Sequence, residues 1–170
     1  NLKTLGFQDS GSATWNSDFY TLQLTSTLGP VLQVGQETYI LFYNDTGGII
    51  ANGTVVRPKS AILVGSEIIP TFEKAKADLF STCEGTIAVT TMEIPIGGVG
   101  LCTRFGRVSG MNTSMFSPGD GLWISDSVAG ALVNVKPEHP SYGISVGGVL
   151  KAHATEGQMI VSVTTSIKDT

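Results

Sequence analysis

The sequence contains one match to a catalytic pattern. Residues 143–147 read Gly-Ile-Ser-Val-Gly, which is the G-x-S-x-G spacing of a serine nucleophile. That pattern works on a strained turn between a strand and a helix, with an acidic residue and then a histidine following along the chain. Here residues 148–150 continue a strand pattern, and no Asp or Glu lies between Ser145 and His153, the last histidine. We therefore interpret the segment as a strand of small residues, predict no catalytic residue, and expect that the protein is not an enzyme.

The residues that could bind a metal are scattered. His139 and His153 are predicted to be exposed loop residues, and they are not spaced as two ligands on one element. Asp45 lies two residues before Gly47, and Asp120 lies between two glycines; at such turns an aspartate caps the turn by accepting hydrogen bonds from nearby amides. A calcium loop needs several carboxylates at alternating positions, which neither segment has. We expect no metal site and no bound cofactor.

Two features could bind an anion. The glycine-rich residues 97–100 lack the following Lys and Ser/Thr of a phosphate loop, and the helix that would present its amides. Arg104 and Arg107 are three residues apart, so on a strand they point to opposite faces. We interpret them as surface or inter-subunit ion-pair residues rather than as an anion site.

The cysteines and the glycosylation tripeptides have structural interpretations. Cys83 and Cys102 are too few for a tetrahedral zinc site or a disulfide framework, so both are expected to be free and buried. The tripeptides that begin at Asn44, Asn52 and Asn112 match the N-glycosylation acceptor. We interpret all three asparagines as turn residues.

Composition excludes several classes of protein. Of 170 residues, 41% are hydrophobic and 14% are charged, and 21 are glycine. A disordered tail carries more charge and fewer apolar residues, and a helical bundle has few glycines. With 10 basic and 14 acidic residues, giving a net charge of −4, the chain is not expected to bind nucleic acid. The remaining class is a β-rich globular or assembly domain with many turns.

The sequence also lacks the signals of a membrane protein. Its apolar stretches, such as residues 86–92 and 128–135, are far shorter than the ~20 apolar residues of a spanning helix. Residues 1–6 lack the apolar core of a signal peptide. We therefore expect no membrane insertion. Because the chain does not begin with Met, we also predict that it is a fragment or a processed product.

Short strand patterns, separated by turn signals at roughly ten-residue spacing, predict an all-β fold. The expected architecture is a β-sandwich or a barrel-like fold of short antiparallel strands. Residues 39–56 predict two tight hairpins, the second with its turn at Asn52-Gly53, a pair that tolerates the positive φ of a type I′ turn. Pro58 is expected to end the return strand.

One short helix is predicted near residues 71–80. Thr71 is available as an N-cap, and Phe72, Ala75 and Leu79 would then fall on one face at spacings of three and four. At about ten residues, such a helix needs tertiary packing to persist.

The helix also suggests a domain boundary near Pro58. Residues 1–57 are predicted as an N-terminal β segment, and residues 58–170 as a sandwich or barrel module that contains the helix. A single domain of residues 1–170 is the alternative.

The stretch from residue 105 onward carries a resemblance to a known group of proteins. Residues 105–116 read Phe-Gly-Arg-Val-Ser-Gly-Met-Asn-Thr-Ser-Met-Phe, and a Ser-Pro-Gly-Asp-Gly turn leads into Leu-Trp-Ile-Ser. A Gly-Ala-Leu-Val-Asn segment, two prolines and a Gly-rich strand pair follow, up to residue 163. This layout resembles a module common in tailed-bacteriophage virion proteins, especially tail fibres and tailspikes. The resemblance covers roughly residues 50–165, and residues 1–50 match no pattern that we can place.

The resemblance implies a structural component of a tail fibre or tailspike. Such a protein serves virion attachment, assembly and host adsorption, and it is located in the virion, in the phage tail. Fibres and spikes of this kind are generally homotrimers, so the implied partners are copies of the chain itself and other phage tail or virion proteins. A host surface glycan or receptor is a further implied partner.

Three alternatives stay open. The same module would suit a capsid decoration, head-fibre, neck or baseplate protein. A glycan-binding domain for receptor recognition could use Trp15, Phe19, Tyr20 or Tyr142 as stacking faces. A hydrolase would use Ser145.

Overall fold

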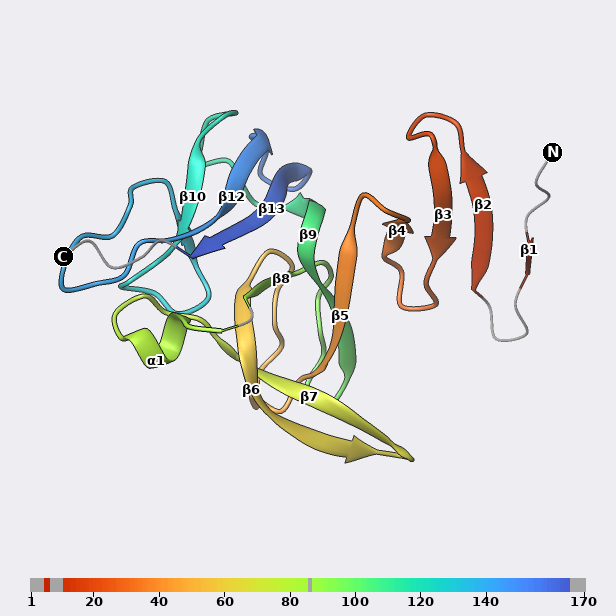
Figure 1. The fold of residues 1–170 in the computed structure, drawn as a ribbon, viewed down its shortest axis with the longest axis horizontal. Helices are drawn as coiled ribbons and strands as arrows, with labels where there is room; N and C mark the ends of the chain where they lie inside the picture. The colour runs from red at the N-terminus through yellow and green to blue at the C-terminus, as the bar shows by residue number, and fades with distance from the viewer. Residues whose placement is uncertain (1–4, 7–10, 86, 166–170) are drawn as a thin grey trace.

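The computed structural model describes residues 5–6, 11–85 and 87–165, and over these residues the chain is all-β. The strands form a four-stranded sheet of order β1-β2-β3-β4 and a nine-stranded sheet of order β11-β10-β12-β13-β9-β5-β7-β6-β8 (Figure 1). A single short helix, α1, accompanies them. The bounds of the elements are β1 Leu5–Gly6, β2 Ser12–Asn16, β3 Thr21–Thr25, β4 Val31–Gln33, β5 Thr38–Tyr43, β6 Val55–Val64, β7 Glu67–Lys74, α1 Phe80–Cys83, β8 Ala88–Thr90, β9 Val99–Met111, β10 Gly121–Ile124, β11 Leu132–Val133, β12 Ile144–Lys151 and β13 Gly157–Thr165.

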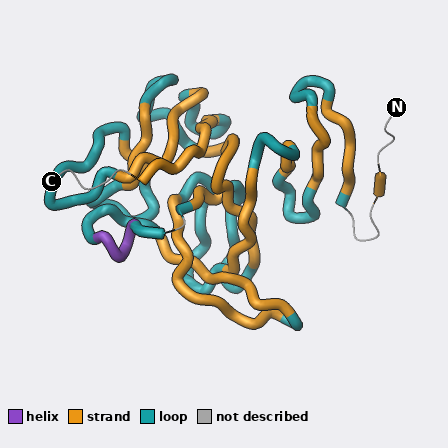
Figure 2. The backbone as a smooth tube through the Cα atoms, in the orientation of Figure 1, coloured by secondary structure: helices purple, strands orange, loops and turns teal. Residues whose placement is uncertain are grey.

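The four-stranded sheet is an antiparallel meander at one end of the long axis of the molecule (Figures 1 and 2). The chain then passes into β5, which belongs to the nine-stranded sheet. The predicted boundary between residues 57 and 58 falls inside β6, so the change of sheet comes earlier, between β4 and β5.

Part of the large sheet closes into a barrel. The strands β9, β5, β7, β6 and β8 pair in that order, and β8 pairs with β9 again. One buried cluster lies among them, with members from every barrel strand: Phe42, Ile50, Val56, Phe72, Ala88, Ile94 and Cys102. The remaining strands β13, β12, β10 and β11 extend the sheet beyond β9.

A second buried cluster packs outside the barrel, against the extension. Consecutive residues of the barrel strands divide between the two clusters, because side chains alternate across a strand. Val56 and Ala88 belong to the barrel cluster, whereas their neighbours Val55 and Val89 belong to the second one. Burial on both faces therefore explains the adjacent apolar pairs Val55-Val56 in β6 and Ala88-Val89 in β8.

One short helix is present among the described residues, as predicted, but it does not span residues 71–80. Residues 67–74 form β7, and α1 has only four residues, Phe80–Cys83. Phe72 lies in the barrel interior, and Ala75 and Ala77 are both fully buried at a spacing of two, which suits an extended chain. Leu79, which was expected on the buried helical face, is exposed. Packing against the barrel therefore outweighs the local helical pattern.

The predicted pair of hairpins over residues 39–56 is also wrong. The Asn52-Gly53 turn is present and Gly53 has a φ of +83°, but the segments on its two sides do not pair with each other. Ile50 bridges to Ile94, and β6 pairs with β7 and β8. The strand β6 also runs through Pro58, with a register shift beside it. Because the barrel closes, the segments on both sides of this turn pair with strands from later in the chain.

The turn role predicted for Asn44 is confirmed. Its buried amide nitrogen lies 2.8–3.1 Å from the carbonyl oxygens of Gly48, Ile94 and Pro95, to which it donates hydrogen bonds. Its Oδ1 accepts hydrogen bonds from the amide and the hydroxyl of Thr46. The side chain thus joins the turn after β5 to the segment before β9.

Replacing Asn44 by alanine is expected to lower the free energy of unfolding by about 2–3 kcal/mol, because buried carbonyl groups lose a donor. Urea denaturation measures this change. Asn112→Ala is the control, since Asn112 is exposed and, among the residues that the structure describes, its side chain bonds to Ser114. Equal losses in the two variants would contradict the role assigned to Asn44.

The prediction of free, buried cysteines is confirmed. Cys83 and Cys102 are both buried and unpaired. Burial raises the pKa of the Cys102 thiol to about 12 and also raises that of Cys83.

Within the described part of the chain, no helix has the length and apolar character needed to cross a membrane.

Candidate functional site

Ser145 lies within a strand and not at a nucleophile turn. It is in β12, where it pairs with Trp123 of β10 and Thr164 of β13. The strand continues to Lys151, six residues or roughly 20 Å further. His153 lies beyond that end, and its Nδ1 accepts hydrogen bonds from the amides of Thr155 and Glu156. The structure therefore does not bring Ser145 and His153 together.

The other predicted candidates are separate from one another. Asp120 caps its turn: Oδ2 accepts hydrogen bonds at 2.9 Å from the Ser117 amide and the Asn134 side chain, which lower the pKa of Asp120. His139 and Arg104 are exposed. Over residues 5–6, 11–85 and 87–165, no group of three His, Cys, Asp or Glu residues could hold a metal ion.

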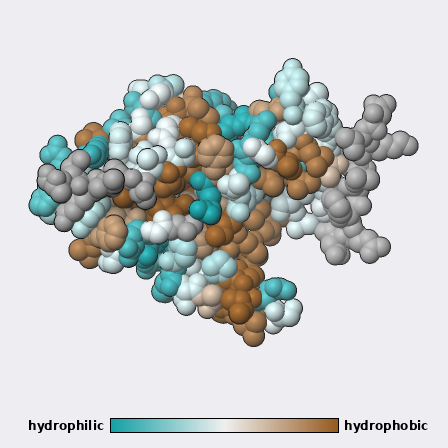
Figure 3. Space-filling view, in the orientation of Figure 1, coloured by the Kyte–Doolittle hydropathy of each residue, from teal (hydrophilic) through white to brown (hydrophobic). Residues whose placement is uncertain are grey.

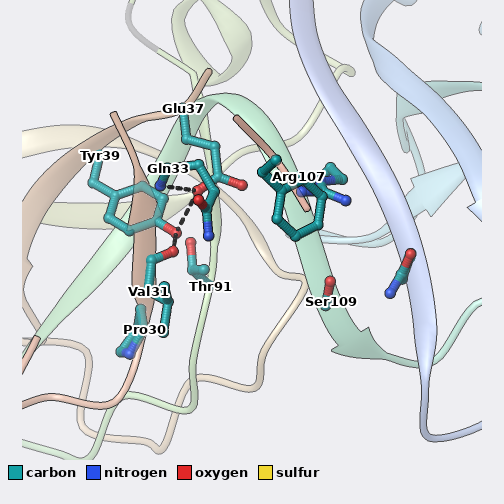
Figure 4. Close-up of a pocket in the computed structure, with 10 residues that line it drawn as sticks. Pro30, Val31, Gln33, Glu37, Tyr39, Thr91, Arg107 and Ser109 are labelled. Carbon is teal, nitrogen blue, oxygen red and sulfur yellow. Dashed lines mark hydrogen bonds between the residues drawn. The ribbon is translucent and has the colours of Figure 1, made fainter. Parts of the chain in front are cut away.

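A pocket of about 320 Å³ lies where the four-stranded sheet meets the barrel (Figure 4). We call it the junction pocket. Five segments supply its walls: the turn before β3, the β4–β5 connection with its flanking strands, the residue after β8, part of β9, and part of β13. The lining residues are Phe19, Pro30, Val31, Gln33, Glu37, Tyr39, Thr91, Arg107, Ser109 and Gln158.

Glu37 is the buried acid of the junction pocket, and only 8% of it is exposed. Its Oε2 lies 2.9 Å from the amide nitrogen of Gln33 and 3.3 Å from the hydroxyl of Tyr39. None of the ion pairs formed by the described residues includes it. Gly106 makes room for it, because a Cβ at Gly106 would come within 2.5 Å of Glu37 Cγ.

Tyr39 is held as a hydrogen-bond donor. Its hydroxyl lies 2.6 Å from the carbonyl oxygen of Val31, closer than it lies to Glu37. Burial raises the pKa of Tyr39 well above its usual range, and the charge and hydrogen bond of Glu37 add to this; Arg107 opposes it. The phenol is therefore neutral at physiological pH.

Gln33 contributes an acceptor that the protein does not use. The residue is 6% exposed, and its Nε2 donates to Oε1 of Gln23 at 3.0 Å. Its own Oε1 is buried and accepts no hydrogen bond from the residues that the structure describes. Such orphaned acceptors are rare in folded proteins and each calls for an explanation.

Arg107 lies on the opposite wall. Its guanidinium carbon is 4.0 Å from the centre of the Phe19 ring, a cation–π contact that joins β9 to the four-stranded sheet. The inter-subunit ion pair expected for Arg107 is not tested by a single chain. Together the two walls offer a ligand hydrogen-bond acceptors, a cation and aromatic rings.

Of the junction-pocket residues, the sequence analysis singled out Phe19 as a candidate stacking face and Arg107 as a surface or inter-subunit ion-pair residue. Trp15 and Tyr20 are exposed, and Tyr142 packs instead against Phe80, with 5.6 Å between ring centroids. A further signal in the sequence was Glu37, an acidic residue two positions before the aromatic segment of residues 39–43.

A second feature is an apolar hairpin that projects from the barrel. We call residues 60–70, the outer parts of β6 and β7, the arm (Figure 1). Apolar residues gather there on the molecular surface (Figure 3). Leu63 and Ile68 face each other across the hairpin and are 66% and 75% exposed. Ile62 and Val64 are exposed beside them.

The edges of the arm are open along most of its length. The pairing of β6 with β8 is confined to Val55 and Val56, and that of β7 with β5 to Thr71. Among the described strands, residues 60–64 of β6 therefore pair only with β7. Unpaired edges of this kind are templates for pairing with another chain.

Comparisons of the chain with known proteins give no match. This holds for protein-family models, for curated protein sequences and for solved structures. Function is therefore argued from the all-β fold, the arm and the junction pocket.

Proposed function

We propose that this chain is a self-assembling structural component of a bacteriophage tail fibre or tailspike, serving virion attachment, assembly and host adsorption. The observation that carries the assembly role is the arm, a projecting hairpin with open edges and exposed apolar residues. A two-stranded hairpin on its own is marginally stable in water. Burial of one large aliphatic side chain contributes about 1.5–3 kcal/mol, so the arm gains stability when it is covered.

We propose that a second copy of this chain covers the arm in the assembly. Residues 60–66 carry no charge, so the arms of neighbouring subunits can meet around a threefold axis without placing like charges together. The low charge of the chain as a whole, 14%, suits surfaces that are buried between subunits. The resemblance of residues 50–165 to tail-fibre modules supports a homotrimer and a place in the phage tail.

Sedimentation-velocity centrifugation at micromolar concentration tests the assembly. We expect about three times the 17.8 kDa mass of one chain. The double variant Leu63→Lys/Ile68→Lys should sediment mainly as monomer, because two charges would have to be buried at the interface. The matched control is Val128→Lys/Val135→Lys, which adds the same charge at exposed apolar residues outside the arm and should leave the assembly intact.

Circular dichroism on all three proteins confirms that they are folded. A monodisperse monomer for the unsubstituted chain would reject self-assembly. Equal dissociation of the control variant would reject the arm as its interface.

Immunogold labelling tests the virion role. Antibodies against the purified chain are applied to particles produced by the genome that encodes it. Labelling of tail fibres or tailspikes is the expected result. Labelling of the capsid, neck or baseplate would favour the alternative virion role, and particles without label would contradict both.

A further inference from the structure

We infer that the four-stranded sheet carries a second interface, at which its apolar face packs against the same face of other copies of this chain. The inference rests on the self-assembly proposed above. It concerns β2, β3 and β4, which lie outside the arm and outside the stretch that resembles tail-fibre modules. It starts from the way in which this sheet is turned relative to the barrel.

Over β2, β3 and β4, one face of the sheet is apolar. Residues directly opposite on neighbouring antiparallel strands lie side by side on one face. The register therefore places Ala13 beside Leu24, and Leu24 beside Leu32, in a single row. Trp15 and Leu22 form the next row of the same face. We call these residues the outer face.

The opposite face is polar, and it is the face turned toward the barrel. Gln23 and Gln33 lie opposite each other on it. Gln33 is buried and lines the junction pocket, where its backbone amide donates to Glu37 (Figure 4). An antiparallel sheet commonly buries its apolar face and leaves its polar face in water. In a single chain this sheet has the reverse arrangement.

The outer face has no core in a single chain. Among the described residues, neither buried cluster includes a member of the four-stranded sheet. Trp15 is 52% exposed, and the three leucines of the outer face are only partly buried. Apolar surface is visible over this sheet (Figure 3). A small sheet is stable when its apolar face packs against another element, so the outer face requires a partner.

The charges of the sheet favour a second copy as that partner. The strands β2, β3 and β4 contain no Asp, Glu, Lys or Arg. Like faces can therefore meet without placing like charges together, whereas a charged partner would find no opposite charge. A lipid surface is disfavoured, because elements that lie on membranes usually carry Lys or Arg beside their apolar residues.

The position of the sheet agrees with the assembly proposed for the arm. The sheet and the arm both lie on the side of the barrel away from β10 (Figure 1). One threefold axis on that side can serve both interfaces, with the three outer faces enclosing a common apolar core. Trp15 is the largest side chain of the outer face, and tryptophan is enriched among the residues that dominate binding energy at interfaces.

Quenching of Trp15 fluorescence by acrylamide tests this arrangement. Trp123→Phe leaves Trp15 as the single tryptophan of the chain. The reference is the arm variant Leu63→Lys/Ile68→Lys on the same background, which is expected to be monomeric. In the assembled chain the quenching constant should be lower by roughly threefold or more, because the core of an interface excludes solvent. Sedimentation of the same samples establishes which of them are assembled.

Trp15→Lys tests the same interface by substitution. Sedimentation equilibrium should show association weakened by about tenfold or more, because each outer face would bury a charge. Ser17→Lys is the matched control, since it adds the same charge at an exposed residue of the turn after β2, and its association should be unchanged. Trp15 is exposed in a single chain, so the substitution should leave the fold intact, which circular dichroism checks.

Three results would overturn this inference and leave the arm interface standing. The first is an assembled chain in which Trp15 is quenched as readily as in the monomeric arm variant. The second is association of Trp15→Lys as tight as that of the unsubstituted chain. The third is shielding of Trp15 by neutral phosphatidylcholine vesicles while the chain is monomeric, which would assign the outer face to lipid. A monomeric unsubstituted chain would instead reject self-assembly as a whole, and this interface with it.

Discussion

Substitution of Gly147 by alanine is expected to lower the free energy of unfolding by about 3 kcal/mol or more. Gly147 lies in β12 between β10 and β13, opposite Leu122 and Val161. A Cβ built there would lie 1.8 Å from the carbonyl oxygen of Ile160, a backbone atom of the neighbouring strand. That atom cannot move aside without disturbing the ladder between β12 and β13.

Urea denaturation measures the loss, with Gly148→Ala as the matched control. A Cβ at Gly148 would meet only the carbonyl oxygen of Asp120, at 3.3 Å, so a shift of a few tenths of an ångström accommodates it. We expect a cost of at most about 1 kcal/mol for the control. Similar costs for the two variants would show that the close approach to Ile160 does not constrain the fold. A larger cost for Gly147→Ala than for Gly148→Ala would show that packing requires a glycine at position 147, the last glycine of the G-x-S-x-G match.

Substitution of Phe42 by alanine is expected to cost about 3–5 kcal/mol, the range for removing a buried aromatic ring. Phe42 and Phe72 are the largest fully buried side chains. Their rings meet edge to face in the barrel, with centroids 5.5 Å apart and planes at 76°. The interior of a small barrel has few other side chains to fill the resulting cavity.

Phe80→Ala is the control for this prediction. Phe80 is 55% exposed, and removal of its ring should cost about 1 kcal/mol or less by the same denaturation measurement. A double variant of Phe42 and Phe72 should cost less than the sum of the single variants, because the two cavities merge. A small loss for Phe42→Ala would contradict the barrel as the organising core.

The fold class could be predicted from the sequence because its evidence is local. Alternating strands, turn glycines and the asparagine turns are properties of a few adjacent residues, and an all-β fold follows from them. Barrel closure is not local. The partner of β5 lies about sixty residues later in β9, and no pattern within residues 39–56 contains that information. Phe72 and Ala75 likewise have a helical spacing, although Phe72 lies in β7 inside the barrel and Ala75 follows that strand in the second buried cluster.

The candidate pocket could not be predicted, for a related reason. Gln33, Tyr39 and Arg107 come from three strands, and Glu37 from the connection before β5. An isolated glutamine in a sequence usually indicates a solvated side chain. Its burial and its orphaned oxygen arise only when the four-stranded sheet meets the barrel.

The pairing of β9 with three other strands has a consequence for synthesis. This strand, residues 99–111, pairs with β5, β8 and β13. On the ribosome, β5 to β8 emerge before β9 exists, so the barrel cannot close until translation has passed residue 111. Throughout that interval the β6–β7 hairpin is the one part of the barrel whose two strands are both present and adjacent in the chain. Under the proposed assembly, nascent chains on neighbouring ribosomes would meet through the arm before either has finished its own barrel.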